Sequence, residues 1–263
     1  MPNAAPDASN PPRELAGRTA VVTGSAQGIG RAIALELATA GANVLVHGRT
    51  SRDAAESVAR ELAEQGVAAQ VELCDLGDPA THAPLVEAAW NWQGGVDIWI
   101  NNAGADVLTG EPAGWSFERK LDALWRVDVV GTLALARECG TRMRQRGSGV
   151  IVNMGWDQAE HGMAGDSGEL FATVKGAVIA FTRSLARSLA PSVRVNCVAP
   201  GWIKTKWGER ASEHWQRTAV EQSLLARWGT PQDVAAAVRF LASPAADFVT
   251  GCVLPVNGGL RQT

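Results

Sequence analysis

The chain has 263 residues, 46% of them apolar, which is enough to build the core of one α/β domain of ordinary size. Charged residues make up 19% and the formal net charge is −3, which excludes a strongly basic nucleic-acid surface. No apolar run reaches the roughly 18 residues of a membrane span. We therefore expect no nucleic-acid and no membrane partner.

Four cysteines lie far apart and form no C-x-x-C pair, so neither a zinc site nor a redox motif is predicted. We expect them to stay reduced, as in a cytoplasmic protein. Residues 1–14 lack the pattern of a secretory signal and are predicted to form a disordered tail before one domain at 15–263. The chain also has ten Trp and no Tyr.

Strands and helices are predicted to alternate from the first apolar run onward. Glycines follow the first strand, and the first helix stops at Gly41. The predicted strands are residues 18–23, 43–47, 69–74, 96–100, 149–154, 193–200 and 253–259. The predicted helices are 31–41, 52–65, 82–93, 114–146, 168–189, 205–226 and 231–243. This alternation predicts a Rossmann-type, doubly wound parallel sheet of about seven strands in a single domain.

A glycine-rich turn separates the first strand from the first helix. Its sequence, TGSAQGIG over 23–30, places glycines at Gly24, Gly28 and Gly30. Gly24 permits a tight turn, Gly28 lets the backbone approach a pyrophosphate, and Gly30 lets the helix pack closely on the strand. The spacing alone fits either a dinucleotide site or a purely structural connection.

Further motifs accompany this turn in a fixed order. They are Asp75 after the third strand, NNAG at 101–104, Lys175, RVNCVAPGWIKT at 194–205 and TGCVLPVNGG at 250–259. With them the chain resembles the short-chain dehydrogenase/reductase family over about residues 15–260. The resemblance implies an NAD(P)-dependent oxidoreductase acting on a small molecule. It also implies a homo-oligomer, a tetramer or dimer, built on the two long helices and the last strand.

The resemblance also assigns residues to the cofactor. The implied contacts are Gly24, Ser25, Gln27, Gly28, Ile29 and Gly30 for the phosphates, Asp75 and Leu76 for the adenine, Asn102, Ala103 and Gly104 for the ribose region, Pro200, Gly201, Ile203 and Thr205 for the nicotinamide, and Lys175. Asn101 is expected to brace the central sheet.

Cofactor choice is expected to lie at the end of the second strand. An acidic residue there would bond the ribose 2′-hydroxyl and repel a 2′-phosphate. Here Gly48 takes that place, and Arg49 and Thr50 follow. Because guanidinium pairs well with phosphate, we predict NADP(H) over NAD(H). The alternative is that Arg49 is only a solvated loop residue.

The family's catalytic Asn, Ser, Tyr and Lys are mostly absent. Phe171 stands at the Tyr position, four residues before Lys175, and Trp156 stands near the Ser position. Asp128 replaces the Asn. A lost general acid costs about 10²–10⁴-fold in rate, so the ordinary carbonyl reaction is expected to be impaired.

The loop between the two replaced positions is rich in acids. Asp157 and Glu160 are the preferred substitutes for the lost acid, because they lie nearest the serine's usual place, and His161 is a further candidate. A carboxyl buried against Trp156 would have a raised pKa and could donate a proton. Ser167 fits a helix cap better than an active-site hydroxyl.

Trp156, Trp202, Trp207 and Trp215 fall in segments that form the family's substrate pocket, which favours a flat or apolar substrate over the alternative of core packing. Three functions stay open. The first is a hydride-transferring NADP(H) oxidoreductase with a substitute acid or an imine substrate. The second is a catalytically silent dinucleotide-binding protein, and the third is a non-redox isomerase or dehydratase.

Overall fold

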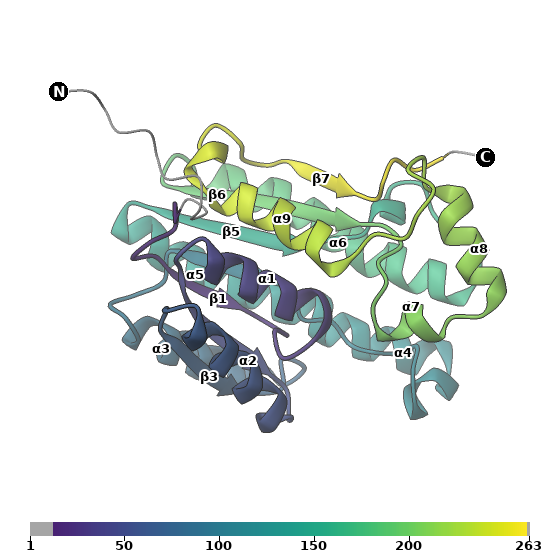
Figure 1. Cartoon of the computed structure of the whole chain (residues 1–263), viewed down its shortest axis with the longest axis horizontal. Helices are drawn as coiled ribbons and strands as arrows, with labels where there is room; N and C mark the ends of the chain where they lie inside the picture. The colour runs from purple at the N-terminus through teal and green to yellow at the C-terminus, as the bar shows by residue number, and fades with distance from the viewer. Residues whose placement is uncertain (1–12, 262–263) are drawn as a thin grey trace.

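The computed structural model describes residues 13–261, in which seven strands form one sheet in the order β3-β2-β1-β4-β5-β6-β7 (Figure 1). Every neighbouring pair of these strands is parallel. Their bounds are β1 Thr19–Val22, β2 Asn43–Gly48, β3 Ala69–Leu73, β4 Ile98–Asn101, β5 Gly149–Met154, β6 Val193–Pro200 and β7 Val253–Val256. The predicted Rossmann-type single domain is confirmed.

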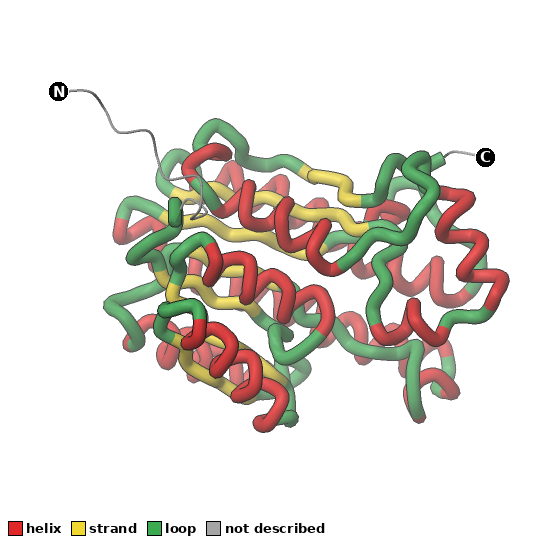
Figure 2. Tube along the Cα trace, in the orientation of Figure 1, coloured by secondary structure: helices red, strands yellow, loops and turns green. Residues whose placement is uncertain are grey.

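Helices cover both faces of the sheet (Figures 1 and 2). One layer holds α1 (Gly28–Thr39), α2 (Arg52–Glu64) and α9 (Pro231–Ala242), and the other holds α3 (His82–Asn91), α5 (Thr132–Arg146) and α6 (Asp166–Leu189). Ile33 and Leu37 lie one turn apart on α1 and are fully buried, which explains why this apolar stripe forms a sheet-packing helix. No helix between residues 13 and 261 combines the length and hydrophobicity that a membrane crossing needs.

The central strands are apolar on both faces because helices cover each side of a parallel sheet. In β4, Ile98 and Ile100 join the core under α1 and α9, and the intervening Trp99 joins the core under α3 and α5. Asn101 at the end of β4 donates to Asn153 Oδ1 of β5 (2.9 Å) and accepts from Trp99 Nε1 (2.8 Å). This is the sheet-bracing role expected of Asn101.

Three predicted elements differ from the observed ones in their bounds. The region 114–146 divides into α4 (Phe117–Leu124), a π-helical segment (Trp125–Gly131) and α5. The region 205–226 divides into α7 (Lys206–Arg210) and α8 (Glu213–Gln222). The last strand ends at Val256, because Gly258 and Gly259 take positive φ angles in the turn that follows.

The predicted tail at 1–14 lies outside the described residues except for Arg13 and Glu14. Those two are held in the fold, since Glu14 pairs with Arg239 (2.7 Å) and Arg13 donates to the carbonyl of Gln65 (2.6 Å).

The sheet changes winding direction between β1 and β4, which are neighbours in space. Ligands of open α/β sheets bind at the carboxyl ends of strands around such a point. The glycine turn after β1, the NNAG stretch after β4 and the loops after β5 and β6 all leave from this edge. The fold therefore brings the sequence motifs together.

Candidate active site

The turn between β1 and α1 leaves room for an anion. Gly28 has a φ of +57°, and a Cβ added there would meet no atom within 4 Å. Gly30 instead packs against the turn, where a Cβ would come within 2.3 Å of the Gly24 carbonyl oxygen. Helix α1 begins without a side-chain cap or an acidic residue in its first turn. Its free N–H groups fit the pyrophosphate of a dinucleotide.

The NNAG stretch is fastened to this turn through Thr23. Its Oγ1 accepts from the backbone N–H of Asn102 (2.9 Å) and of Ala103 (3.0 Å). The Asn102 side chain also donates to the Thr23 carbonyl (2.9 Å). The two predicted cofactor segments therefore form one rigid wall.

Ser25 has a different role from the one expected. It is fully buried, its hydroxyl donates to the Val22 carbonyl (2.7 Å), and it accepts from the His47 backbone N–H (3.0 Å). Its side chain shapes the turn and is not exposed to a ligand.

Arg49 and Thr50 are exposed directly after the buried Gly48. Within residues 13–261, Arg49 makes no hydrogen bond or ion pair, so its guanidinium is available to an anion. Across the turn, Lys206 Nζ of α7 donates to Gln27 Oε1 (3.1 Å). A second cation thus reaches the start of α1 from a segment 179 residues away in sequence.

Three more residues predicted to contact the cofactor differ in how far they are exposed. Asp75 is exposed, and its Oδ1 accepts from the Gly77 backbone N–H (2.8 Å). Leu76 is buried and Ile29 is half-buried.

A buried ion pair joins Lys175 and Asp128. Lys175 Nζ lies 2.8 Å from Asp128 Oδ1, and the two side chains are 11% and 2% exposed. Asp128 Oδ2 accepts from the Ala105 backbone N–H (2.8 Å), directly after NNAG. Asp128 lies in the π-helical segment, a local irregularity that often occurs at functional sites. The structure thus brings together two of the predicted catalytic residues.

Trp156 packs against Phe171, which lies one helical turn before Lys175 on α6. Their ring centroids are 6.3 Å apart in an edge-to-face arrangement. Two of the three positions where the sequence departs from the family's catalytic pattern therefore meet in space and form an apolar contact.

Asp157, the next residue after Trp156, is buried. Its Oδ2 accepts from Asn257 Nδ2 (3.1 Å), and its Oδ1 is enclosed with no hydrogen-bond partner among residues 13–261. Burial raises the pKa of Asp157 to about 6. A Cβ added to Gly201 would lie 3.0 Å from Oδ2, so the carboxyl adjoins the Pro200 loop.

The other two predicted acids lie at the surface. Glu160 forms an exposed ion pair with Arg183 (2.7 Å), and His161 is exposed. Helix α6 is capped by Gly165 without a side-chain hydrogen bond, so the cap expected at Ser167 is not formed.

The loop after β6 is ordered by backbone bonds. Gly201 donates to the Val256 carbonyl (3.1 Å), Thr205 donates to the Ile203 carbonyl (2.8 Å), and Ile203 is buried. Strand β6 ends at Pro200. The loop that follows lies beside the Asp157 carboxyl, as the closeness of Gly201 to Oδ2 shows.

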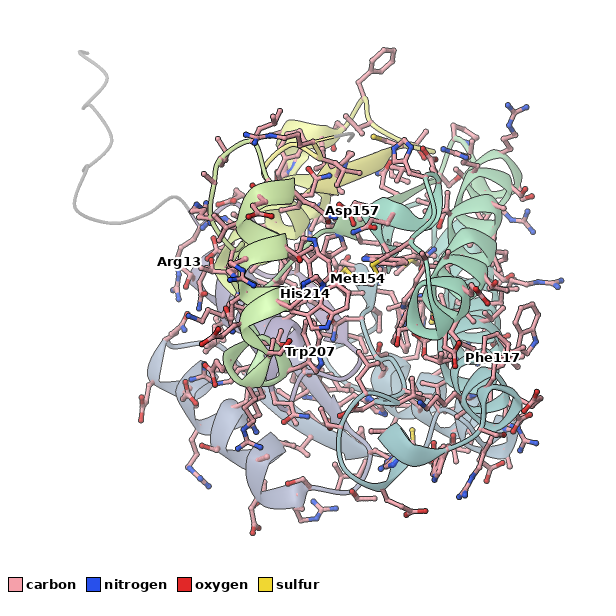
Figure 3. The ribbon with its side chains drawn as sticks, turned by 90° about the vertical axis from the view of Figure 1, so that its right-hand side faces the viewer. Arg13, Phe117, Met154, Asp157, Trp207 and His214 are labelled. Atoms are coloured by element: carbon pink, nitrogen blue, oxygen red, sulfur yellow. The ribbon has the colours of Figure 1, made fainter. Side chains whose placement is uncertain are left out.

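The tryptophans of the loops pack on one another. The Trp202 ring lies 6.2 Å from Trp207, 5.3 Å from Trp215 and 6.1 Å from Trp228. Figure 3 looks onto the carboxyl ends of the strands and shows Trp207 near the same end of the sheet as Asp157. Trp156 is paired with Phe171 instead.

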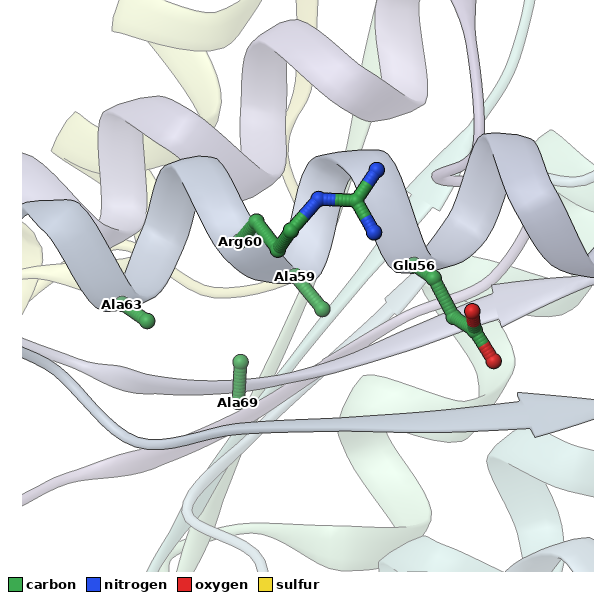
Figure 4. Close-up of a pocket in the computed structure, with 5 residues that line it drawn as sticks. All are labelled: Glu56, Ala59, Arg60, Ala63 and Ala69. Atoms are coloured by element: carbon green, nitrogen blue, oxygen red, sulfur yellow. The ribbon is translucent and has the colours of Figure 1, made fainter.

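A shallow hollow lies away from this site, between α2 and β3 (Figure 4). It is lined by Glu56, Ala59, Arg60, Ala63 and Ala69, none of which belongs to the candidate site.

Four residues at or near the site escaped the sequence interpretation: His47, Lys206, Trp228 and Asn257. Asn257 bonds to a residue 100 positions away, so no local pattern reveals it. Trp228 comes two residues after the Trp-bearing segment at 205–226, so the high density of Trp in this part of the sequence could have indicated it.

Comparisons with known proteins agree with this arrangement. Residues 24–261 match the family model described as enoyl-(acyl carrier protein) reductase. The chain is 39% identical over 253 residues to 3-oxoacyl-[acyl-carrier-protein] reductase FabG of Aquifex aeolicus, covering 94% of this chain and 98% of that one. It is 34% identical to short-chain dehydrogenase/reductase SDRA of Arabidopsis thaliana, covering 95% and 96%.

A solved structure is similar over the same length. The gluconate 5-dehydrogenase of Burkholderia cenocepacia J2315, in complex with NADP and tartrate, aligns with a TM-score of 0.83 and 31% identity, covering 96% of this chain and 98% of that one. With the fold, the glycine turn, NNAG and Lys175 in place, the chain belongs to the short-chain dehydrogenase/reductase family.

Proposed function

We propose that the protein is an NADP(H)-dependent oxidoreductase with a non-standard active site. It transfers hydride to or from a small, flat or apolar carbonyl, alcohol or imine. The observation that carries the proposal is the open, uncapped start of α1 at Gly28, walled by Asn102 and Ala103. The similar gluconate 5-dehydrogenase holds NADP, which supports the same class of ligand here.

Arg49 supports the choice of phosphate-bearing cofactor. It is exposed without a partner among the described residues, and the position before it is Gly48 rather than an acid. Guanidinium binds phosphate through strong charge-assisted hydrogen bonds. Fluorescence titration with NADPH and NADH tests this choice, and tighter binding of NADH contradicts it.

Proton supply falls to Asp157 in this proposal. The amide of Asn257 donates to Oδ2, so the proton of the neutral carboxyl is carried on Oδ1. With a pKa of about 6, a substantial fraction is protonated in mildly acidic solution. When bound, the reduced nicotinamide would supply the hydride for the carbonyl carbon, and Asp157 would supply the proton for its oxygen, a transfer that requires the enclosed Oδ1 to be uncovered when substrate binds. A protonated imine needs the hydride alone.

Lys175 and the apolar pair have supporting roles. Lys175 forms an ion pair with Asp128 on one side, and its ammonium has three N–H donors, so donors remain for cofactor or substrate hydroxyls. Trp156 and Phe171 form an apolar wall beside it. Such a wall favours a substrate with a flat or apolar body.

The test of the reaction is NADPH oxidation over a panel of carbonyls and imines. Asp157→Asn is expected to lower carbonyl turnover by about 10²–10⁴-fold, the usual contribution of a positioned acid. Glu160→Gln is the matched control, because that carboxyl is exposed and paired with Arg183. Unchanged turnover in both variants removes Asp157 as the acid.

A second function, dinucleotide binding without redox turnover, is supported by a different observation. Asp157 Oδ1 is enclosed, and Asp128 already neutralises Lys175. This function predicts tight NADPH binding and no oxidation across the whole panel. Turnover by the wild type rules it out.

We also propose a homo-oligomer. Trp125 and Val130, on the π-helical segment that also carries Asp128, are 43% and 38% exposed, and Phe248 before β7 is fully exposed. Exposed apolar side chains of this size are candidates for burial between subunits. Light scattering coupled to size exclusion measures the mass, and a monomer contradicts this proposal.

A further inference from the structure

The phosphate turn is held from behind by a histidine that no motif includes. His47 lies near the end of β2 and is 2% exposed. Its Nδ1 lies 3.0 Å from the Gly24 backbone nitrogen, and its Nε2 lies 3.2 Å from the Cys74 carbonyl oxygen. The imidazole therefore spans the distance from the turn after β1 to the end of β3.

These contacts determine the state of the ring. The Gly24 N–H can only donate, so Nδ1 must carry a lone pair. The Cys74 carbonyl can only accept, so Nε2 must carry the hydrogen. His47 is thus neutral, and burial agrees with this by lowering its pKa to about 4.

The backbone of His47 holds the next residue of the turn. Its carbonyl accepts from the Ser25 N–H (2.8 Å), and its N–H donates to Ser25 Oγ (3.0 Å). With the bond to Gly24, one residue of β2 satisfies the backbone N–H groups of both Gly24 and Ser25. Neither N–H is then left for a ligand, which must use the free groups at the start of α1.

The opposite side of Gly24 is closed. A Cβ added there would lie 2.9 Å from the Ala103 Cα, and the Gly24 carbonyl accepts from Asn102 Nδ2 (3.3 Å). The turn is therefore held between NNAG and the imidazole before any ligand binds. Loss of the imidazole leaves the buried Gly24 N–H without a hydrogen-bond partner and allows the turn to shift.

We infer that His47 is a positioning residue that pre-forms the phosphate turn by accepting the Gly24 N–H, so that the start of α1 meets a dinucleotide pyrophosphate without rearrangement. The inference rests on the proposed function, because it assigns the ligand of the same site. Pre-organisation of this kind raises affinity by removing the ordering cost of binding. Both NADPH and NADH contain the pyrophosphate, so both are affected.

Two substitutions separate the hydrogen bond from the bulk of the ring. His47→Leu removes the acceptor, and His47→Asn retains one, since Asn Oδ1 occupies the place of His Nδ1 on the same Cγ. Met143→Ala is the stability control, because Met143 is fully buried beside Gly149 at the amino end of β5, away from the turn.

The experiment measures the Kd of NADPH and NADH by fluorescence, together with hydrogen exchange of the segment 23–30 without cofactor. His47→Leu is expected to weaken both cofactors by about tenfold and to speed exchange in the turn, because the buried Gly24 N–H loses its acceptor and the bond from the ring to the Cys74 carbonyl is lost as well. His47→Asn is expected to restore both readouts to near wild type. Met143→Ala is expected to lower the urea midpoint without changing Kd.

The outcomes are distinguishable. Unchanged exchange at 23–30 in His47→Leu overturns the inference, whether or not cofactor binds. Equal weakening of binding by Met143→Ala also overturns it, because the effect would then follow stability alone. Failure of the wild type to bind either cofactor overturns the proposed function instead, while faster exchange in His47→Leu still supports the pre-formed turn.

Discussion

Replacing Asp157 with Asn removes a buried carboxyl that is costly to ionise. The side chain is 8% exposed, one oxygen is bonded only to Asn257, and the other has no partner among the described residues. Asn has nearly the same shape and can still accept from Asn257. The substitution therefore tests the charge with little change in packing.

The magnitude follows from the pKa. Burial raises it from 3.8 to about 6 in the folded protein, so the native state holds the proton more tightly than the unfolded chain. Between these values the unfolded state ionises first and stability falls as pH rises, and above pH 6 the full penalty persists. At 1.36 kcal/mol per pH unit, the penalty is about 3 kcal/mol.

The assay is urea unfolding of both proteins at one protein concentration, from about pH 3.5 to about pH 7.5. The stability of Asp157→Asn minus that of the wild type is expected to increase by about 3 kcal/mol over this range. His47, whose pKa is lowered, has the opposite slope, but it is present in both proteins and cancels in the difference. A difference that is flat with pH refutes the raised pKa.

Other variants give direct tests of the site. Phe171→Tyr places a phenol near Lys175 and is expected to raise carbonyl turnover by about 10²-fold or more. Equal rates of NADPH oxidation by the variant and the wild type would contradict this expectation. Arg49→Leu is expected to weaken NADPH by about tenfold and leave NADH unchanged, and Arg52→Leu is the control, because Arg52 pairs with the residue one turn on along α2 (3.5 Å). Lys206→Met is expected to weaken the binding of both cofactors several-fold at low salt, because a contact to their shared pyrophosphate is lost. The same change at the exposed Lys204 is expected to have no effect on binding. Cofactor titrations at two salt concentrations check both expectations.

Local pattern predicted the strands and most helices because a parallel sheet covered on both faces demands continuous apolar runs separated by amphipathic helices. The π-helical segment at 125–131 was not predictable in this way. Its Asp128 contacts Lys175 and the Ala105 N–H, and contacts between segments so far apart in sequence leave no local signal.

The backbone geometry of the glycine turn could be predicted from the sequence, and the surroundings of the acid-rich loop could not. Glycines report backbone geometry directly, so Gly28 and Gly30 could be assigned from spacing. Which acid of the replacement loop is buried could not be assigned. Glu160 lies only three residues from Asp157, yet Arg183 holds it at the surface while Asn257 holds Asp157 inside.

Hydride transfer itself is the central claim, and it can be observed without knowing the natural substrate. The wild type is incubated with NADPH carrying deuterium at the nicotinamide C4 and a panel of flat or apolar carbonyls and imines, and the products are analysed by mass spectrometry. We predict a product that carries one deuterium from the wild-type protein. Labelled product from Phe171→Tyr alone, with none from a wild type that binds NADPH, would contradict the account.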